Sequence, residues 1–219
     1  MVAFQNVVGF ATALLLNQRL PGQAAARALI LLPWILPGVV AAILWRFMFD
    51  PQLGLINSFL IRTDLTAGPI AWLADTGTAL PAAIVAAVWK GFPFSTIVYL
   101  AALQDIDQDL VEAARIDGAG PWRRLFAIVL PSIRGTVVIN VILTTILTFN
   151  YFDMIWVLTR GGPQDATAIF PTKIYELGFG QFRFGEAAVY GVLSIVLLLI
   201  LLAVSVIVRR SVAQRRESA

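Results

Sequence analysis

The sequence predicts an all-α integral membrane protein, and three observations lead to that prediction. First, 59% of the 219 residues are hydrophobic and only 13% are charged, whereas soluble domains carry about 25% charged residues. Second, several apolar stretches have the roughly 20 residues that a helix needs to cross about 30 Å of hydrocarbon. Third, the basic residues gather in alternate loops, as in a protein that crosses a membrane repeatedly.

Five apolar segments are the expected transmembrane helices of a single membrane domain, residues 1–219. Segment 2–16 is short, because at about 1.5 Å per residue it reaches only some 22–24 Å. The other four have full length and comprise residues 28–49, 80–103, 137–158 and 187–208.

The loops predict the orientation. Residues 18–27, the segment 105–134 and the tail after residue 208 hold ten of the sixteen Lys and Arg residues, whereas loops 50–79 and 160–186 hold four. Positive-inside bias therefore places segment 105–131 and the C-terminus in the cytoplasm.

This topology leaves an external N-terminus, so we expect six helices, of which the N-terminal one, with a cytoplasmic tail, is missing. A signal peptide over the first segment is the alternative, although residues 1–6 lack the positive charge that it needs.

Composition also narrows the chemistry. The chain has no Cys and no His, so it lacks thiol ligands, disulfides and the commonest general base and metal ligand. Hydrolytic or metal-dependent catalysis is therefore not expected, although carboxylates could act. The basic residues lie where membrane topology requires them, which gives no indication of nucleic-acid binding.

The polar segment 105–131 carries helix signals of its own. Asp109 followed by Glu112 has the form of a capping box and predicts a helix over 110–117. Gly118 suits a left-handed C-terminal cap. Pro121 suits the start of a second helix over 121–130, which Pro131 ends or kinks. A helix of about eight residues is not stable alone in water, so we expect a partner to dock on it. Taken singly, each of these residues could be only a cap, a helix stop or part of a solvated face.

Polar side chains inside the apolar segments are the candidates for a transport path. Lys90 lies near the middle of 80–103, where a lysine costs about 2.5–3.5 kcal/mol on insertion. It is either a pore-wall donor or a cation that snorkels or pairs with a carboxylate such as Asp153. Gly91 and Pro93 would loosen the same helix. Thr148, Asn150 and Tyr151 either line the path or join helices by hydrogen bonds.

The polar segment resembles the EAA loop of permease subunits of ATP-binding-cassette (ABC) importers. The matching residues are Glu112, Ala113, Ala114, Gly118, Ile128, Leu130 and Pro131. The variant Asp117-Gly118-Ala119 resembles the carbohydrate-uptake branch, of the maltose and glycerol-phosphate type. Further matches extend the resemblance over essentially the whole chain, including Trp89-Lys90 and Gly161-Gly162-Pro163.

The resemblance implies a function and its partners. Residues Glu112, Ala113, Ala114, Asp117, Gly118 and Ala119 would couple the permease to a cytosolic ATPase. A second permease, two ATPases that bind ATP and Mg, and an extracytoplasmic solute-binding protein would complete an importer in a bacterial or archaeal cytoplasmic membrane. The chain itself would hold no cofactor and perform no catalysis. The sugar path would involve Lys90, Gly91, Phe94, Thr148, Asn150 and Tyr151.

Three other interpretations stay open. A permease for another solute class would share the EAA loop, but the Asp-Gly-Ala variant and the Gly-Gly-Pro loop argue against it. A secondary transporter would not need a coupling loop. An inactive, truncated permease would keep the loop while lacking one helix.

Overall fold

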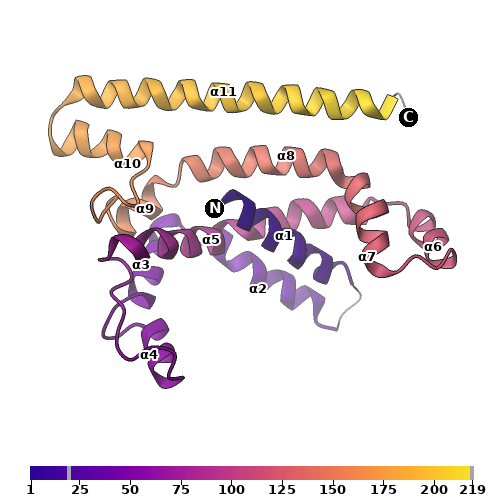
Figure 1. Ribbon diagram of the computed structural model, residues 1–219, viewed down its shortest axis with the longest axis horizontal. Coiled ribbons are helices and arrows are strands. Elements are labelled where there is room, and N and C mark those ends of the chain that lie inside the picture. The colour runs from indigo at the N-terminus through magenta and orange to yellow at the C-terminus, as the bar shows by residue number, and fades with distance from the viewer. Residues whose placement is uncertain (19–20, 218–219) are drawn as a thin grey trace. The chain divides into compact units, whose positions relative to one another are not determined.

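The computed structural model describes residues 1–18 and 21–217, and this part of the chain is helical, without a β-strand. The all-α prediction is therefore confirmed. Arg19, one of the basic residues that indicated the orientation, lies outside the described residues. The elements are α1 (Val2–Leu16), α2 (Gln23–Ile35), α3 (Gly38–Met48), α4 (Leu55–Arg62), α5 (Thr76–Gln104), α6 (Gln108–Ile116), α7 (Pro121–Arg124), the π-helical η1 (Leu125–Val129), α8 (Leu130–Phe149), α9 (Phe152–Leu158), α10 (Phe170–Tyr175), the π-helical η2 (Glu176–Gly180) and α11 (Phe184–Glu217) (Figure 1).

Three helical stretches in the described residues are long and apolar enough to cross a membrane. They are Thr76–Gln104, Pro121–Phe149 and Phe184–Ser205. Helices α2 and α3 pass the same test together but are bent by 97°. Helix α1 coincides with predicted segment 2–16 and is apolar but shorter.

Two predicted segments differ from the structure. Segment 28–49 is not one straight helix, because the backbone leaves the helix at Leu36–Pro37 and resumes in α3. The prediction of a single helix over 137–158 is wrong. The helix ends at Phe149, and α9 starts after Asn150 and Tyr151. Asn150 turns its side-chain amide back onto Ile146 O at 2.9 Å, which is a local hydrogen bond that competes with helix continuation.

Prolines within the helices are accommodated rather than acting as stops. Pro131 does not end the predicted helix 121–130, because Pro121–Phe149 is continuous. The π-helical turn Leu125–Val129 directly precedes it, and its widened backbone makes room for a ring that would clash in a regular α-helix. Gly91 and Pro93 likewise lie inside the unbroken α5.

The chain divides into two compact units, each with a core of its own. Unit 1 comprises Met1, Leu32–Gly91 and Ile146–Leu199, and unit 2 comprises the described residues of Val2–Leu31, Phe92–Thr145 and Ile200–Ala219.

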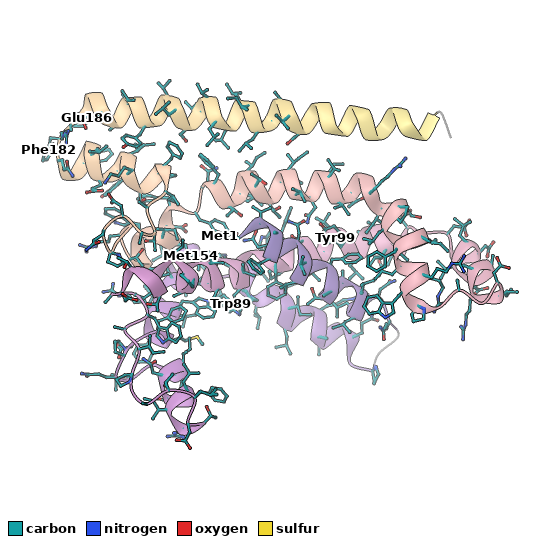
Figure 2. The ribbon with its side chains drawn as sticks, in the orientation of Figure 1. Met1, Trp89, Tyr99, Met154, Phe182 and Glu186 are labelled. Carbon is teal, nitrogen blue, oxygen red and sulfur yellow. The ribbon has the colours of Figure 1, made fainter. Side chains whose placement is uncertain are left out.

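The core of unit 1 joins α3, α5 and α9. Its buried members are Ala42, Trp45, Phe49, Ala82, Ala83, Ala86, Met154, Ile155 and Leu158. The alanines of α5 let neighbouring backbones approach closely, as is usual between membrane helices. Trp45 fills the remaining space, with its ring 5.7 Å from that of Trp89 in an edge-to-face contact. Trp89 and Met154 of this core are labelled in Figure 2.

The core of unit 2 joins α1, α5 and α8 through Ala13, Tyr99, Leu103 and Ile133. The ring of Phe10 packs edge-on against that of Tyr99 at 5.5 Å. Buried polar side chains on the same three helices, among them Asn6, Thr96, Asn140 and Thr144, are hydrogen-bonded to one another or to backbone carbonyls. The unit is therefore held by polar as well as apolar contacts, and it carries α6 and α7 at one end.

Candidate functional site

Helix α6 begins two residues earlier than the sequence indicated. The N-cap is Asp107, whose Oδ1 accepts a 3.0 Å hydrogen bond from Asp109 N. Asp109 is therefore in the first turn rather than at the cap, and the predicted Asp109–Glu112 capping box is wrong. An aspartate at either position favours the positive end of the helix dipole, so the motif alone did not distinguish them.

The predicted glycine cap at the other end of α6 is confirmed. Gly118 has φ +75°, a left-handed conformation that glycine adopts without penalty. Ala119 N donates to Ala114 O at 2.9 Å, and Gly118 N donates to Arg115 O at 3.2 Å. This pair of bonds is the Schellman motif, which satisfies the carbonyls of the last turn. The helix thus has fixed ends although it is only nine residues long.

The surface of α6, α7 and η1 exposes large apolar side chains. Ile116 is 86% exposed, Trp122 72%, Phe126 63% and Leu110 56%. The rings of Trp122 and Phe126 stack at 6.3 Å. Val129, farther along the same helical stretch, packs against the unit 2 core, whereas Trp122 and Phe126 stay exposed. The exposed side chains therefore form a surface without a partner within the described chain.

The expected coupling residues lie together on this surface. Glu112, Ala113, Asp117 and Gly118 are exposed, and Ala114 and Ala119 are half-buried. Within the described residues, the Glu112 carboxylate makes no hydrogen bond or ion pair. Since Asp107 provides the cap, Glu112 is not needed to start the helix and is free to contact another molecule.

Lys90 is engaged with backbone rather than with a side chain. Its ammonium donates to the carbonyl oxygens of Pro33, Trp34 and Leu36 at 3.3, 3.1 and 2.5 Å. Asp153 is not an ion-pair partner of Lys90, since no Lys90–Asp153 contact within 4.0 Å occurs among the described residues.

The other expected path residues do not converge on one point. Gly91 is buried in α5, and Phe94 is half-buried in unit 2. Tyr151 packs against the unit 1 core, and Asn150 is exposed. Thr148 alone of the six lines one of the larger cavities.

That cavity lies in unit 1, next to the break between α8 and α9, and has a volume of about 440 Å³. Its wall combines aromatic rings with charged groups, namely Thr148, Phe149, Asp165, Ala168, Ile169, Phe170, Lys173 and Tyr190. Phe149 and Phe170 stack at 5.7 Å. Phe170, Lys173 and Tyr190 were not predicted from the sequence. Phe170 and Lys173 lie in loop 160–186, and Tyr190 lies in the apolar segment 187–208, where it could not be told from the other apolar residues. Aromatic faces beside polar donors are suited to binding a sugar.

An ion-pair network stands at the edge of this cavity. Lys173 Nζ contacts Asp165 Oδ2 and Glu176 Oε2, both at 3.0 Å. Hydrogen bonds to Asp165 and then to Glu176 raise the pKa of Lys173 above its ordinary value. The lysine therefore stays charged over the physiological range and keeps the loop 159–169 attached to α10.

A second cavity in unit 1, of about 540 Å³, has two arginines in its wall. Arg46 at the end of α3 and Arg160 after α9 are both exposed, and the floor includes Phe49, Leu73 and Leu158. Asp50 in the same wall accepts hydrogen bonds from Leu53 N and Gln52 N, which lower the pKa of its carboxyl. Over the described residues, no group of three or more His, Cys, Asp or Glu could hold a metal ion.

Comparison with known proteins assigns the chain to a family. Residues 5–217 match the family described as binding-protein-dependent transport system inner membrane component. The trehalose/maltose transport system permease protein MalF of Thermococcus litoralis is 37% identical over 216 residues, which are 99% of this chain and 71% of the relative. The sn-glycerol-3-phosphate transport system permease protein UgpA of Yersinia pestis is 35% identical over 95% of this chain and 69% of its own.

Solved structures agree with the sequence relatives. A chain of a bacterial ABC transporter involved in the import of the acidic polysaccharide alginate superposes with a TM-score of 0.83 at 26% identity, over 93% of this chain and 72% of that one. The MetNI methionine ABC transporter shares the fold, with a TM-score of 0.66 at 20% identity over 96% of this chain and 88% of that one. The match over nearly the whole chain, together with the capped α6 and its exposed surface, means that this protein belongs to the binding-protein-dependent transport system inner membrane components, the permease subunits of ABC transporters.

Proposed function

We propose that this chain is a pore-forming permease subunit of an ABC importer for a carbohydrate. The sequence relatives that carry a substrate in their names are transport proteins for trehalose and maltose or for sn-glycerol-3-phosphate, and the structure at 26% identity belongs to an alginate importer. The methionine transporter, at 20% identity, shares the fold alone. The observation that carries the proposal is the α6 surface, where a rigidly capped helix presents apolar side chains and a free carboxylate. Such a surface serves transport coupling and has no use in an isolated pore.

In this proposal, segment 105–131 docks on a cytosolic ATPase. Glu112, Ala113, Ala114, Asp117, Gly118 and Ala119 form the contact, with Ile116 as its apolar anchor. ATP and Mg bind to two ATPase subunits rather than to this chain, which performs no catalysis. A second permease completes the pore, and an extracytoplasmic solute-binding protein delivers the sugar; one alginate importer structure includes its periplasmic protein with a bound pentasaccharide. The complex lies in a bacterial or archaeal cytoplasmic membrane with the C-terminus in the cytoplasm.

The proposed sugar path passes the cavity beside Thr148. The stacked Phe149 and Phe170 offer an apolar face for the sugar ring, and Thr148 offers a polar group for its hydroxyls. Asn150 is exposed at the adjacent helix break and can contribute from there. Gly91, Phe94 and Tyr151 remain path candidates by the family resemblance alone. Lys90, whose ammonium is bound by three backbone carbonyls, is not included among the sugar ligands.

Two variants of α6 test the coupling. Glu112→Lys and Ile116→Asp, each introduced into the full complex, are expected to reduce both retention of the ATPase subunits on purification and sugar-stimulated ATP hydrolysis. Asp64→Lys, which makes the same charge change at an exposed residue after α4, is the control and should behave like the wild type. If both α6 variants retained the ATPase and transported normally, the coupling proposal would be wrong.

Uptake of a panel of radiolabelled solutes separates the remaining alternatives. Uptake of a sugar that requires ATP supports the carbohydrate importer. ATP-driven uptake restricted to another solute class would contradict the carbohydrate assignment, and uptake without the ATPase would indicate a secondary transporter. A complex that assembles without transporting any solute would indicate an inactive permease.

A further inference from the structure

The bend between α2 and α3 leaves backbone carbonyls without their usual helical donors. In a continuous helix, the Pro33 carbonyl would accept from the N–H of residue 37, but residue 37 is a proline and has none. The chain leaves the helix at Leu36, so the neighbouring carbonyls lose their helical donors as well. An unpaired carbonyl is costly in a membrane, where no water replaces the lost bond.

Lys90 of α5 supplies the missing donors. Its ammonium lies against the carbonyls of Pro33, Trp34 and Leu36, the group at the C-terminal end of α2. A helix C-terminus carries partial negative charge, which favours a cation at this position. One lysine therefore satisfies three acceptors and neutralises the end of the helix, and its own charge is accommodated inside the protein.

The other side of the bend carries the opposite charge. Helix α3 begins at Gly38, and its N-cap, Pro37, makes no side-chain capping bond. The carboxylate of Asp153 lies directly over Gly38, at a place where a Cβ on that residue would overlap it. Its Oδ1 also accepts from Met154 N at 2.9 Å. The N-terminus of α3 carries partial positive charge, so Asp153 supplies the matching anion.

We propose that Lys90 and Asp153 form a charge-matched brace that fixes the bend between α2 and α3. Lys90 interacts mainly with the C-terminal end of α2 and Asp153 mainly with the N-terminal end of α3, rather than with each other. The brace positions α3 against α5 and α9 in the core of unit 1. Helix α3 and the residue after it place Arg46 and Phe49 in the wall of the 540 Å³ cavity, and α9 places Val157 and Leu158 there. Lys90 and Asp153 are thus positioning residues, and Gly38 is the small residue that admits the carboxylate.

An ordinary ion pair or a pore-wall donor at Lys90 would respond differently to substitution. An ion pair would survive exchange of its two charges, so the double variant Lys90→Asp/Asp153→Lys would restore the wild-type state. In the brace, the exchange places an anion against the carbonyl oxygens at the end of α2 and a cation at the N-terminus of α3, and it cannot restore the bend. A pore-wall donor would affect the apparent KM for sugar, and its loss would leave the bend unchanged.

The bend can be measured directly, because the chain has no native cysteine. Spin labels at Leu32→Cys and Phe47→Cys, two exposed positions on either side of the bend, report its geometry as a distance distribution in the full complex with cysteine-free partner subunits. We expect one narrow distribution in the wild type and in Lys90→Arg, which conserves the charge and the donors. Lys90→Met, Asp153→Asn and the exchanged pair should broaden or shift it and lower the thermal midpoint.

Two outcomes would overturn the brace. The first is a wild-type distribution in the exchanged pair, and the second is an unchanged distribution in Lys90→Met. Should Lys90→Met not assemble, Lys90→Gln keeps N–H donors without the charge; an intermediate distribution supports the brace, and a wild-type one contradicts the need for charge. The measurement requires neither ATPase activity nor a known sugar. Its failure is therefore distinct from a failure of the proposed function.

Discussion

The hydroxyl of Tyr99 donates a 2.5 Å hydrogen bond to Oδ1 of Asn6, which joins α5 to α1 in the interior of unit 2. The same oxygen accepts from Asn140 Nδ2 of α8 at 2.8 Å. The Asn6 amide donates to Thr144 Oγ1 at 3.0 Å and to Val2 O at 2.9 Å. Asn6 thus uses both acceptor positions and both N–H groups. One side chain connects three helices, and it ties the short α1 to the bundle.

The protein should lose more stability as more of the hydrogen bonds of the Asn6 side chain are removed. Tyr99→Phe removes one of the four bonds and should cost about 0.6 kcal/mol, and at most about 1.7, which is the range for hydrogen bonds between membrane helices. Asn6→Leu leaves groups on Tyr99, Asn140 and Thr144 without their partner at once and should cost about 2–3 kcal/mol. Unfolding in detergent micelles, followed by circular dichroism, measures both.

A second tyrosine provides the control for this series. The Tyr175 hydroxyl makes no hydrogen bond within the described residues, where the residue is linked by ring contacts alone. Tyr175→Phe should therefore leave the unfolding midpoint unchanged. Equal midpoints for Asn6→Leu and the wild type would contradict the role assigned to Asn6.

The polar residues show how far the sequence could predict the interior. Thr144 and Thr148 belong to the same predicted segment, and the sequence offered two roles, path lining or hydrogen bonding between helices. The structure gives them different surroundings, since Thr144 bonds Asn6 and Thr148 lines a cavity. Residues one helical turn apart share a face, so helical periodicity could not separate them. The partner of Thr144 lies 138 residues away, beyond any local pattern.

Segment 105–131 was predicted more closely because its signals are local. The Gly118 cap depends on a backbone conformation that glycine adopts readily, and it was located correctly. The error at Asp109 came from three nearby carboxylates, Asp105, Asp107 and Asp109, any of which satisfies the dipole. The continuity through Pro131 could not be seen, because a π-helical turn has no sequence signal of its own.

The two glycines of the α6–α7 turn give a matched pair of variants. Gly118 has φ +75° and Gly120 has φ −62°, and a Cβ would meet no atom within 4 Å at either position. Gly118→Ala should cost about 1–2 kcal/mol through the left-handed backbone alone, whereas Gly120→Ala should be nearly neutral. Hydrogen exchange of the last turn of α6 should rise in the first variant only, together with weaker ATPase retention. Equal exchange in both variants would contradict the cap.

The Lys173 network should respond to alkaline pH. The pKa of Lys173 is raised in the folded protein, so the stability that it contributes is fully present below the unfolded value of about 10.4 and is lost as pH rises through the higher folded value. The thermal midpoint of the wild type should therefore exceed that of Lys173→Met by a constant margin from pH 7 to 9. That margin should shrink above about pH 10.4.

An ion pair between an arginine and a glutamate supplies the control for this titration. Arg183 contacts Glu186 across a turn at the start of α11 (Figure 2 labels Glu186). A guanidinium does not titrate in this range, so any margin between the wild type and Arg183→Met should not change from pH 7 to 11. A Lys173 margin that also stayed constant to pH 11 would exclude the ion pairs as its source.

Asn57 should hold the segment of unit 1 between α3 and α5. Its side chain is buried and donates to Ile70 O at 2.9 Å, and it accepts from Ile70 N at 3.2 Å and from Trp72 Nε1 at 3.0 Å. Weaker bonds reach the carbonyls of Asp50 and Pro51 at 3.4 and 3.3 Å. One amide therefore joins α4 to the non-helical residues that follow it, Ile70 and Trp72. We expect Asn57→Ala to destabilise this segment by about 1–3 kcal/mol, the penalty for leaving buried groups unpaired.

Limited trypsin digestion tests the Asn57 prediction, because Arg62 lies at the end of α4, in the same segment, and is exposed. Cleavage after Arg62 should accelerate in Asn57→Ala, since the backbone around this peptide bond must unfold locally before it fits the active site of the protease. Asn57→Asp keeps the acceptors for Ile70 N and Trp72 Nε1 but loses the donors, so it should fall between the alanine variant and the wild type. Asn17→Ala changes an exposed asparagine at the end of α1 and should leave the cleavage rate unchanged. Identical rates in all four proteins would mean that this segment is held by its apolar contacts to the unit 1 core, where Ile56, Trp72 and Leu73 pack, and not by Asn57.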